Sequence, residues 1–223
     1  MTVYLGSPNS QVQAHAANGM PVLLSYFILH TRNWWKQYVP SFKQILIDCG
    51  AYSAYTSGKE IDPIAYKDWA ARYPWADACA GVDDIAGDFR KSLRNYEVFG
   101  FPTMHDSDPI ELLSDLIPIA RERGDWLGIG LVPPREGKEN FVRYVCDNVP
   151  EDIHIHGWAL RQYLHIPRID SADSTAWFRN ALSLKSHFLT AHLTYAECVD
   201  IMVKKFQRAE RIRNYEEQQL DLF

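Results

Sequence analysis

The stretch Gln44-Ile45-Leu46-Ile47-Asp48-Cys49-Gly50 contains an unbroken run of apolar side chains and then a carboxylate and a glycine. Apolar residues without alternation are typical of a strand that is buried on both faces, as the strands of parallel sheets are. We therefore predict a strand over Gln44–Asp48 that carries Asp48 at its carboxyl end. The glycine permits an unusual turn or a close approach of the backbone.

Similar short runs recur along the chain and alternate with stretches of helical periodicity. The predicted strands are Val3–Gly6, Pro21–Phe27, Gln44–Asp48, Ala78–Asp83, Pro102–His105, Trp126–Leu131, Asp152–Gly157 and Pro167–Ser171. The predicted helices are Ser10–Asn18, Asp62–Tyr73, Asp108–Arg123, Lys138–Asn148, Ser174–Leu184 and a long helix from Thr194 onward. Eight strands with helical crossovers predict an α/β protein with a closed (β/α)8 barrel of the TIM type. A doubly wound open sheet is the alternative.

The length of 223 residues predicts one barrel domain, residues 1–190, and a C-terminal helical tail, residues 191–223. Apolar residues make up 47% and charged residues 23%, the mixture of a globular protein. No apolar run approaches the ~20 residues that a membrane span needs. The first residues lack the pattern of a signal peptide, so we expect a cytoplasmic protein of a bacterium or of a phage-infected host.

The cysteines and the net charge limit the classes of site that we expect. Cys49, Cys79, Cys146 and Cys198 are widely spaced and form no Cys-x-x-Cys pair. We therefore expect reduced thiols, no zinc site and no other cofactor. The net charge of −5 gives no support for a broad phosphate-binding surface, although charge can be segregated locally.

Polar side chains gather where predicted strands end, which is where barrel enzymes carry their active sites. They are Asp48, the pair Asp83 and Asp84, His105, and the pair Asp170 and Asp173. Each also has a simpler interpretation. Asp48 would cap its loop, Asp84 or Asp88 and Asp173 would cap helices, and His105 would be a structural hydrogen-bonding group.

His154 and His156 form a His-x-His pair in the seventh predicted strand. We expect one to face the barrel interior and the other to face the helices. The pair also suggests a metal, but no acidic or cysteine partner lies at a suitable spacing, so we do not predict a metal site.

Taken together, the carboxylates suit the cleavage of an N-glycosidic bond. That cleavage builds positive charge on the sugar, which one carboxylate can stabilise or trap as a covalent intermediate. A second acid then handles protons on the base. Asp48 and Asp173 are suitable candidates for these two roles.

Several motifs in the order of the chain resemble those of the tRNA-guanine transglycosylase superfamily. Asp48-Cys49-Gly50-Ala51-Tyr52 resembles its Asp-Ser-Gly-Gly-aromatic motif, and Val82-Asp83-Asp84 its Phe-Asp-Glu strand end. Gly128-Ile129-Gly130-Leu131 resembles its Ile-Gly-Gly-Leu loop, and Ile169-Asp170-Ser171-Ala172-Asp173 its Ile-Asp-x-Phe-Asp motif. The resemblance covers about residues 1 to 185. It is nearest to the short, phage-type branch, which is related to enzymes that place 7-deazaguanines in DNA.

The resemblance implies a role for each matching residue. Asp173 would be the nucleophile at C1′, and Asp48 the general acid/base. The residues that would bind the base or line its pocket are Tyr52, Asp83, Asp84, His105, Gly130, Leu131, His156 and Trp158. His105 stands roughly where the family has a glutamine that reads the base.

The implied reaction is the exchange of guanine for a free 7-deazaguanine such as preQ0 or preQ1. The tRNA enzymes of the family carry a zinc site of three cysteines and a histidine after the nucleophile, whereas this chain has only Cys198 there. We therefore expect DNA as the substrate, with tRNA as the alternative. A hydrolytic N-glycosylase and a non-catalytic binding module are the other interpretations.

The last residues, Gln219-Leu220-Asp221-Leu222-Phe223, resemble the short peptide by which bacterial DNA-processing proteins dock on the replication sliding clamp. Gln219 would supply hydrogen bonds, and Leu222 and Phe223 would supply apolar side chains for a pocket; Leu220 also belongs to the predicted partner-binding peptide. The alternative is that the tail folds back and buries its own phenylalanine.

Overall fold

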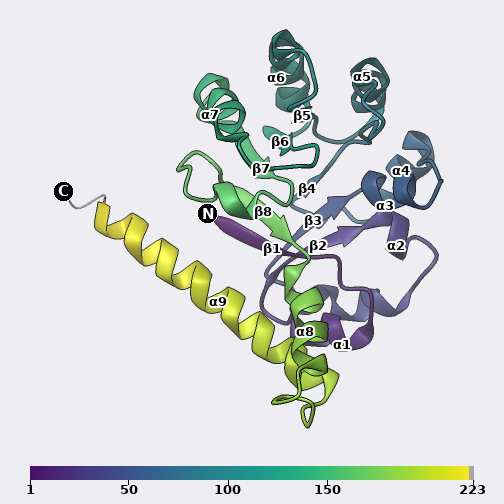
Figure 1. Cartoon of the computed structure of the whole chain (residues 1–223). Coiled ribbons are helices and arrows are strands. Elements are labelled where there is room, and N and C mark those ends of the chain that lie inside the picture. Colours follow the sequence, from purple (N-terminus) through teal and green to yellow (C-terminus); the bar gives the residue numbers. More distant parts are fainter. Residues whose placement is uncertain (221–223) are drawn as a thin grey trace.

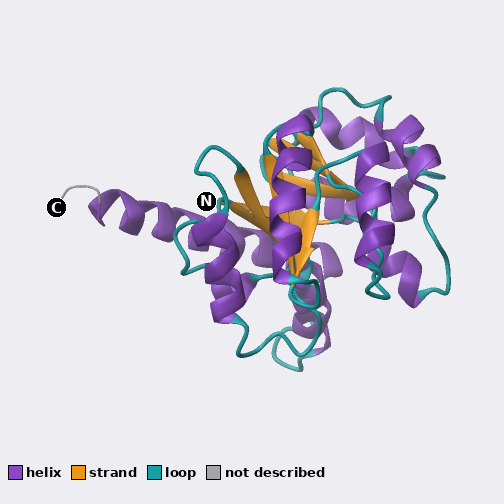
Figure 2. Cartoon of the chain, turned by 90° about the horizontal axis from the view of Figure 1, so that it is seen from above, coloured by secondary structure: helices purple, strands orange, loops and turns teal. Residues whose placement is uncertain are grey.

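The computed structural model describes the backbone of residues 1–220 and the side chains of all of these except Arg161 and residues 209–220. Eight short strands lie in the middle of the molecule, and helices surround them (Figures 1 and 2). The strands are β1 (Thr2–Gly6), β2 (Pro21–Ser25), β3 (Gln44–Asp48), β4 (Ala78–Cys79), β5 (Thr103–His105), β6 (Trp126–Gly130), β7 (His154–Gly157) and β8 (Ser171–Ser174).

The helices follow the strands along the chain. The α-helices are α1 (Gln11–Ala16), α2 (Tyr26–Leu29), α3 (Ala51–Thr56), α4 (Pro63–Ala70), α5 (Phe89–Val98), α6 (Leu113–Glu122), α7 (Glu139–Asn148), α8 (Ala176–Ser186) and α9 (Tyr195–Leu220). The 3-10 helices are η1 (Trp34–Ser41), η2 (Ile110–Leu112) and η3 (Arg161–Tyr163). Helix α4 begins after Asp62, whose side chain caps the helix by accepting a hydrogen bond from the Ile64 N–H.

The strands form one parallel sheet in the order β4-β3-β2-β1-β8-β7-β6-β5. This order is that of a (β/α)8 barrel opened between β4 and β5, and it differs from a doubly wound sheet because β1 pairs with β8. The sheet is curled rather than closed by strand pairing, because β4 and β5 do not pair as strands. Only a single parallel bridge, Ala80 to Phe101, links the chain just after β4 to the chain just before β5.

The inner face of the curled sheet is filled by one apolar cluster. Tyr4, Leu23, Leu46, Ala80 and Phe101 come from β1, β2, β3 and the two sides of the β4–β5 seam. Ala78, Trp126 and Trp158 pack against them. The sheet must therefore curl far enough for its two edges to share a core.

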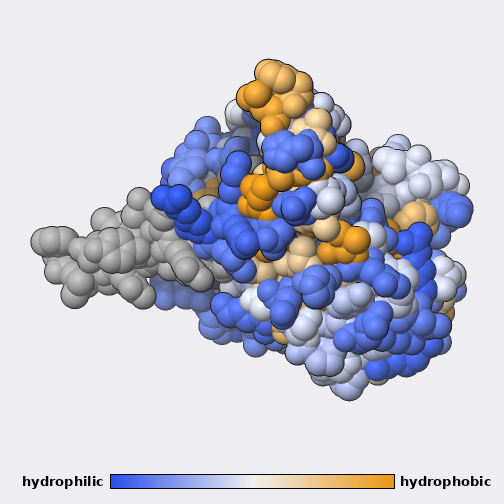
Figure 3. All heavy atoms as spheres, turned by 90° about the horizontal axis from the view of Figure 1, so that it is seen from below, coloured by the Kyte–Doolittle hydropathy of each residue, from blue (hydrophilic) through white to orange (hydrophobic). Residues whose placement is uncertain are grey.

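Two further clusters lie between the sheet and the helices. One packs β2 and β3 against α4, α8 and α9 and includes the buried Trp35, Trp69 and Trp177. The other packs β6 and β7 against α6 and α7. Outside these cores, the face seen in Figure 3 is mostly hydrophilic with separate apolar patches.

The predicted boundaries fail most clearly at β8. The predicted strand Pro167–Ser171 is wrong, since the strand spans Ser171–Ser174. The Arg168 guanidinium donates to the Asp170 carboxylate and to the Pro150 and Ile153 carbonyls, which makes this segment a polar connection rather than a strand. The observed strand, Ser-Ala-Asp-Ser, carries no apolar run that would reveal it.

Other differences are smaller. The predicted strand Pro21–Phe27 ends at Ser25 because α2 begins at Tyr26, and the predicted strand Ala78–Asp83 is regular only over Ala78–Cys79. Helices α2, α3 and α5 were not predicted. Helix α5 has a recognisable start, because the Asp88 carboxylate accepts hydrogen bonds from the N–H groups of Arg90 and Lys91.

The long C-terminal helix is confirmed as α9, which runs away from the curled sheet in Figures 1 and 2. Thr194 and Glu197 form a capping box at its start, each side chain accepting a hydrogen bond from the other's backbone N–H. Cys198, Val199, Met202 and Val203 bury its first turns. Over the residues that the structure describes, no helix is both long and apolar enough to span a membrane.

Candidate functional site

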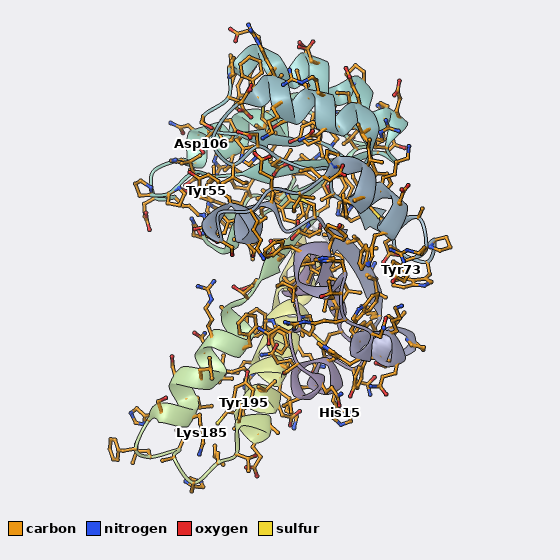
Figure 4. All side chains as sticks on the ribbon, turned by 90° about the vertical axis from the view of Figure 1, so that its right-hand side faces the viewer. His15, Tyr55, Tyr73, Asp106, Lys185 and Tyr195 are labelled. Atoms are coloured by element: carbon orange, nitrogen blue, oxygen red, sulfur yellow. The ribbon has the colours of Figure 1, made fainter. Side chains whose placement is uncertain are left out.

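The carboxyl ends of the strands open onto a cavity of about 410 Å³. In Figure 4, Tyr55 and Asp106 follow β3 and β5 and lie on one side of the molecule, whereas His15 and Tyr73 precede β2 and β4 and lie on the other. Nine of the residues predicted for the site line this cavity: Asp48, Tyr52, Asp83, Asp84, His105, Gly130, Leu131, Trp158 and Asp173. The site prediction therefore brings together residues from β3, β5, β6, β8 and the adjoining loops.

Asp48 ends β3 beside Ser25 of β2. Burial raises the pKa of its carboxyl to about 7, although a hydrogen bond from the Gly50 backbone opposes the shift, and the charges of Asp173 and Asp83 add to it. Gly50 has a φ of 80°, and a β-carbon there would collide with the Ser25 hydroxyl. Asp48 thus combines the predicted loop-capping hydrogen bond with the raised pKa of a group suited to acid/base chemistry.

Asp173 lies within β8 rather than after it, opposite Tyr4 of β1. Its Oδ1 accepts a hydrogen bond of 2.8 Å from the backbone N–H of Ala159. Ala159 has a φ of 52°, a conformation that costs energy for a residue with a side chain and that occurs often at functional sites. The alternative role of Asp173 as a helix cap is wrong, because Ser174 accepts the hydrogen bond from the Ala176 N–H at the start of α8.

Asp83 and His105 form a polar pair on the opposite wall. The Tyr96 hydroxyl donates to Asp83 Oδ1 at 2.7 Å, and His105 Nε2 lies 3.2 Å from Asp83 Oδ2. Burial lowers the pKa of His105, but the hydrogen bond and charge of Asp83 outweigh it, so the pKa is raised overall. The pair lines the cavity with a carboxyl and an imidazole, which can offer an acceptor and a ring nitrogen to a ligand.

Asp84 also lines the cavity, but its carboxylate is already engaged. Oδ1 lies 3.0 Å from Lys91 Nζ, and Oδ2 accepts a hydrogen bond from the Asp88 N–H. Burial raises the pKa of Asp84, whereas these two partners lower it, and the net shift is downward. Asp84 therefore holds the loop before α5 rather than presenting free oxygens to a ligand.

The remaining predicted residues shape the wall and mouth. The Trp158 indole stacks on Phe101 with an interplanar angle of 6° and donates to Thr103 Oγ1. Tyr52 is 58% exposed at the mouth on α3. Leu131 is buried, and the Gly130 carbonyl accepts a hydrogen bond from the Asp106 N–H.

His156 does not line the cavity, contrary to the prediction, because it is fully buried beneath Asp173. The expectation that His154 and His156 face opposite sides is also wrong. Both imidazoles contact the same Ser171 hydroxyl, since residues two apart in a strand point the same way. Among the described residues, no group of three or more side chains is arranged to hold a metal ion.

The structure adds residues to the site that sequence reasoning missed. Ser7 and Ser25 line the cavity, and their buried hydroxyls have no hydrogen-bond partner in the part of the chain that the structure describes. Arg135 and Arg179 lie at the wall, hydrogen-bonded to the Leu131 carbonyl and the Thr175 hydroxyl. An isolated serine or arginine in a sequence carries no signal that distinguishes it from other surface residues.

Comparison with models of protein families, with curated proteins and with solved structures found no match.

The first prediction concerns the effect of Asp48 on the free energy of unfolding. Because its folded pKa is about 7 and its ordinary value is 3.8, the unfolded state loses this proton first as the pH rises. Asp48 therefore lowers the free energy of unfolding progressively as the pH rises from about 4 to about 7. Below about pH 4 it has no such effect. Replacing it by asparagine should raise the free energy of unfolding at pH 8 by a few kcal/mol, at most about 4 kcal/mol, and much less at pH 4. Urea denaturation at both pH values measures this, and an equal effect at both would contradict it.

The second prediction concerns Gly130, where a β-carbon would collide with the His105 imidazole. Gly130→Ala should displace the ring, break its contact with Asp83 and destabilise the protein by about 1–3 kcal/mol. In a His105→Ala background the same substitution should cost much less, because the colliding ring is absent. Denaturant unfolding of the two single variants and the double variant tests this, and additive costs would show that the collision is not the cause.

Proposed function

We propose that this protein is a transglycosylase that exchanges guanine in DNA for a 7-deazaguanine base through a covalent glycosyl-aspartate. The observation that carries the proposal is the pairing of Asp48 and Asp173 in one cavity. One carboxyl has its pKa raised to about 7, and the other accepts a backbone hydrogen bond that orients it. Two carboxyl groups in such different environments are typical of an acid/base and a nucleophile.

In the proposed first half-reaction, a carboxylate oxygen of Asp173 forms a bond to C1′ while the bond from C1′ to the guanine nitrogen breaks. The leaving base takes the electron pair of that bond together with a proton from Asp48. In the second half-reaction, ionised Asp48 takes a proton from the incoming base. The nitrogen of that base then attacks C1′ and releases Asp173.

Base recognition is assigned to the wall opposite the nucleophile. Asp83 and His105 would accept from and donate to the polar edge of the base, and Trp158 and Tyr52 would contact its faces. Asp84 has the weaker case, because Lys91 and the Asp88 N–H already occupy its carboxylate.

The charges around the cavity suit a nucleotide within a strand. Asp48, Asp83 and Asp173 lie where a base and sugar would bind, while Arg135 and Arg179, which have no carboxylate partner among the described residues, are available to phosphates. Because the positive charges are separated from the carboxylates in this way, the net charge of −5 does not argue against phosphate binding at this site. It does not choose between nucleic acids, and the preference for DNA rests on the missing cysteines after Asp173 and on the C-terminal peptide.

The third prediction is the exchange itself. Protein incubated with DNA or tRNA carrying labelled guanine, with and without preQ0 or preQ1, should release label from DNA and incorporate the added base. In the absence of an added base, denaturing electrophoresis should detect a protein–DNA adduct. Asp173→Asn should abolish both signals, and Asp68→Asn, at an exposed position of α4, should leave them unchanged.

Other outcomes of this experiment would overturn the proposal in distinct ways. Label released from tRNA alone would indicate a tRNA enzyme. Release with an abasic product and no incorporation would indicate a hydrolytic glycosylase. Full activity of Asp173→Asn would remove Asp173 as the nucleophile, and no release from either substrate would favour a binding module.

We also propose that the C-terminal peptide docks on the bacterial sliding clamp. Asp221–Phe223 and the side chains of Gln219 and Leu220 lie outside what the structure describes, so the support comes from α9, which carries Leu220 away from the curled sheet (Figure 1). The fourth prediction is that purified clamp binds the full chain and that deletion of residues 219–223 abolishes binding without changing the melting temperature. Equal binding of the shortened chain would contradict it.

A further inference from the structure

A chain of polar side chains, the buried His156 and Ser171 and the partly buried His154, lies directly beneath Asp173. His156 Nδ1 lies 2.8 Å from Ser171 Oγ, and His154 Nε2 lies 2.7 Å from the same oxygen. His156 Nε2 is buried without a hydrogen-bond partner among the described residues, and its nearest carboxylate oxygen is Asp173 Oδ1 at 3.7 Å. The proposed reaction assigns no role to His154, Ser171 or His156.

We propose that His156 is a positioning residue that donates its Nε2–H to Asp173 and is itself oriented by Ser171 and His154. The catalytic part of this inference rests on the proposed function, whereas the hydrogen-bond chain does not. Contacts of this kind are often long without substrate and shorten in the complex, so a separation of 3.7 Å suits a donor that completes its bond on binding.

The direction of the chain follows from counting protons. An ionised Asp173 accepts only, so the nitrogen facing it must carry the proton. A neutral imidazole has one N–H and one lone pair, so His156 Nδ1 must then accept from the Ser171 hydroxyl. Ser171 Oγ is thereby free to accept from His154 Nε2–H, and each proton is used once.

Most of the groups around His156 carry no charge. Burial lowers the pKa of His154 to about 4, so it carries no charge at neutral pH. The other groups that face His156 are the rings of Tyr4, Trp126 and Trp158. Burial raises the pKa of Tyr4, which therefore also stays neutral, and Asp173 is the only charged neighbour in the described contacts of this ring.

A role in positioning Asp173 would explain why the hydrogen-bonded side chains of His154, Ser171 and His156 occupy the interior. Burying a histidine and a serine, with a second histidine partly buried beside them, costs more than burying apolar side chains of similar size, unless their hydrogen bonds are satisfied. An N–H held rigidly against Asp173 fixes which carboxylate oxygen faces the sugar. Because Ala159 also donates to Oδ1, the same oxygen would accept both bonds and leave Oδ2 for attack on C1′.

The first test needs no substrate. Nitrogen-15 NMR of the histidine side chains in the full chain at pH 7.5 should show His156 as the Nε2–H tautomer and His154 as neutral, with the signals assigned by comparison with His154→Gln and His156→Gln. A His156 protonated at Nδ1, and therefore donating to Ser171, would overturn the proposal whether or not exchange activity is found.

The second test uses a matched pair of amides. Glutamine places its terminal amide near the position of Nε2 and can still donate to Asp173, whereas the shorter asparagine reaches only as far as Nδ1. His156→Gln should retain exchange activity, while His156→Asn should lose about 100-fold in kcat, the effect of a misplaced reacting group, with KM little changed. Equal losses in both variants at equal melting temperatures would mean a purely structural role. Absence of exchange by the unaltered protein would instead refute the proposed function and leave the NMR result to decide the hydrogen-bond chain.

Discussion

The β4–β5 seam is the constraint on which the rest of the molecule depends. The Phe101 N–H donates to the Cys79 carbonyl, and the Gly81 N–H donates to the Phe101 carbonyl, so two backbone hydrogen bonds join the edges of a sheet that would otherwise be open. Phe101 also inserts its ring into the inner cluster, against Trp126 and Trp158. Because the edges meet here, Asp83 and His105 from this side share one cavity with Asp48 and Asp173 from the other. A flat sheet with the same strands would separate these residues.

The cavity concentrates carboxyl groups in a place that water only partly reaches, and this determines their chemistry. Asp48 is destabilised as an anion by burial and by the neighbouring charges of Asp173 and Asp83. Asp83 and Asp173 have other donors beside them: a tyrosine hydroxyl and an imidazole for the former, and the Ala159 backbone amide for the latter. Side chains of one type are therefore placed in different environments by their partners. The same principle explains why Asp84, with a lysine beside it, is an anchor and not a reactive group.

Much of this arrangement could be predicted from the sequence, and the failures have physical causes. Apolar runs located β1, β3 and β6 because strands buried on both faces exclude polar residues. Strand β8 was misplaced because its inward side chains, Ser171 and Asp173, belong to the polar chain and to the candidate site, which removes the apolar signal. The sequence does not show which face of β7 points inward. The spacing of two residues shows only that His154 and His156 lie on the same face. Ser7, Ser25 and Arg179 reach the cavity through tertiary packing, for which no local pattern exists.

Helix α9 is a rigid extension of the molecule. Its first turns are held by the capping box and by Cys198, Val199 and Met202, so the helix leaves the body in a fixed direction. From Phe206 to Leu220 it extends about 21 Å, at the rise of an α-helix. A flexible linker of that many residues would let its two ends explore all separations up to its full length, whereas a helix specifies one. Whatever binds at the far end of α9 is therefore kept at a set spacing from the curled sheet, which favours partners whose geometry matches that spacing and excludes those that require the two to touch.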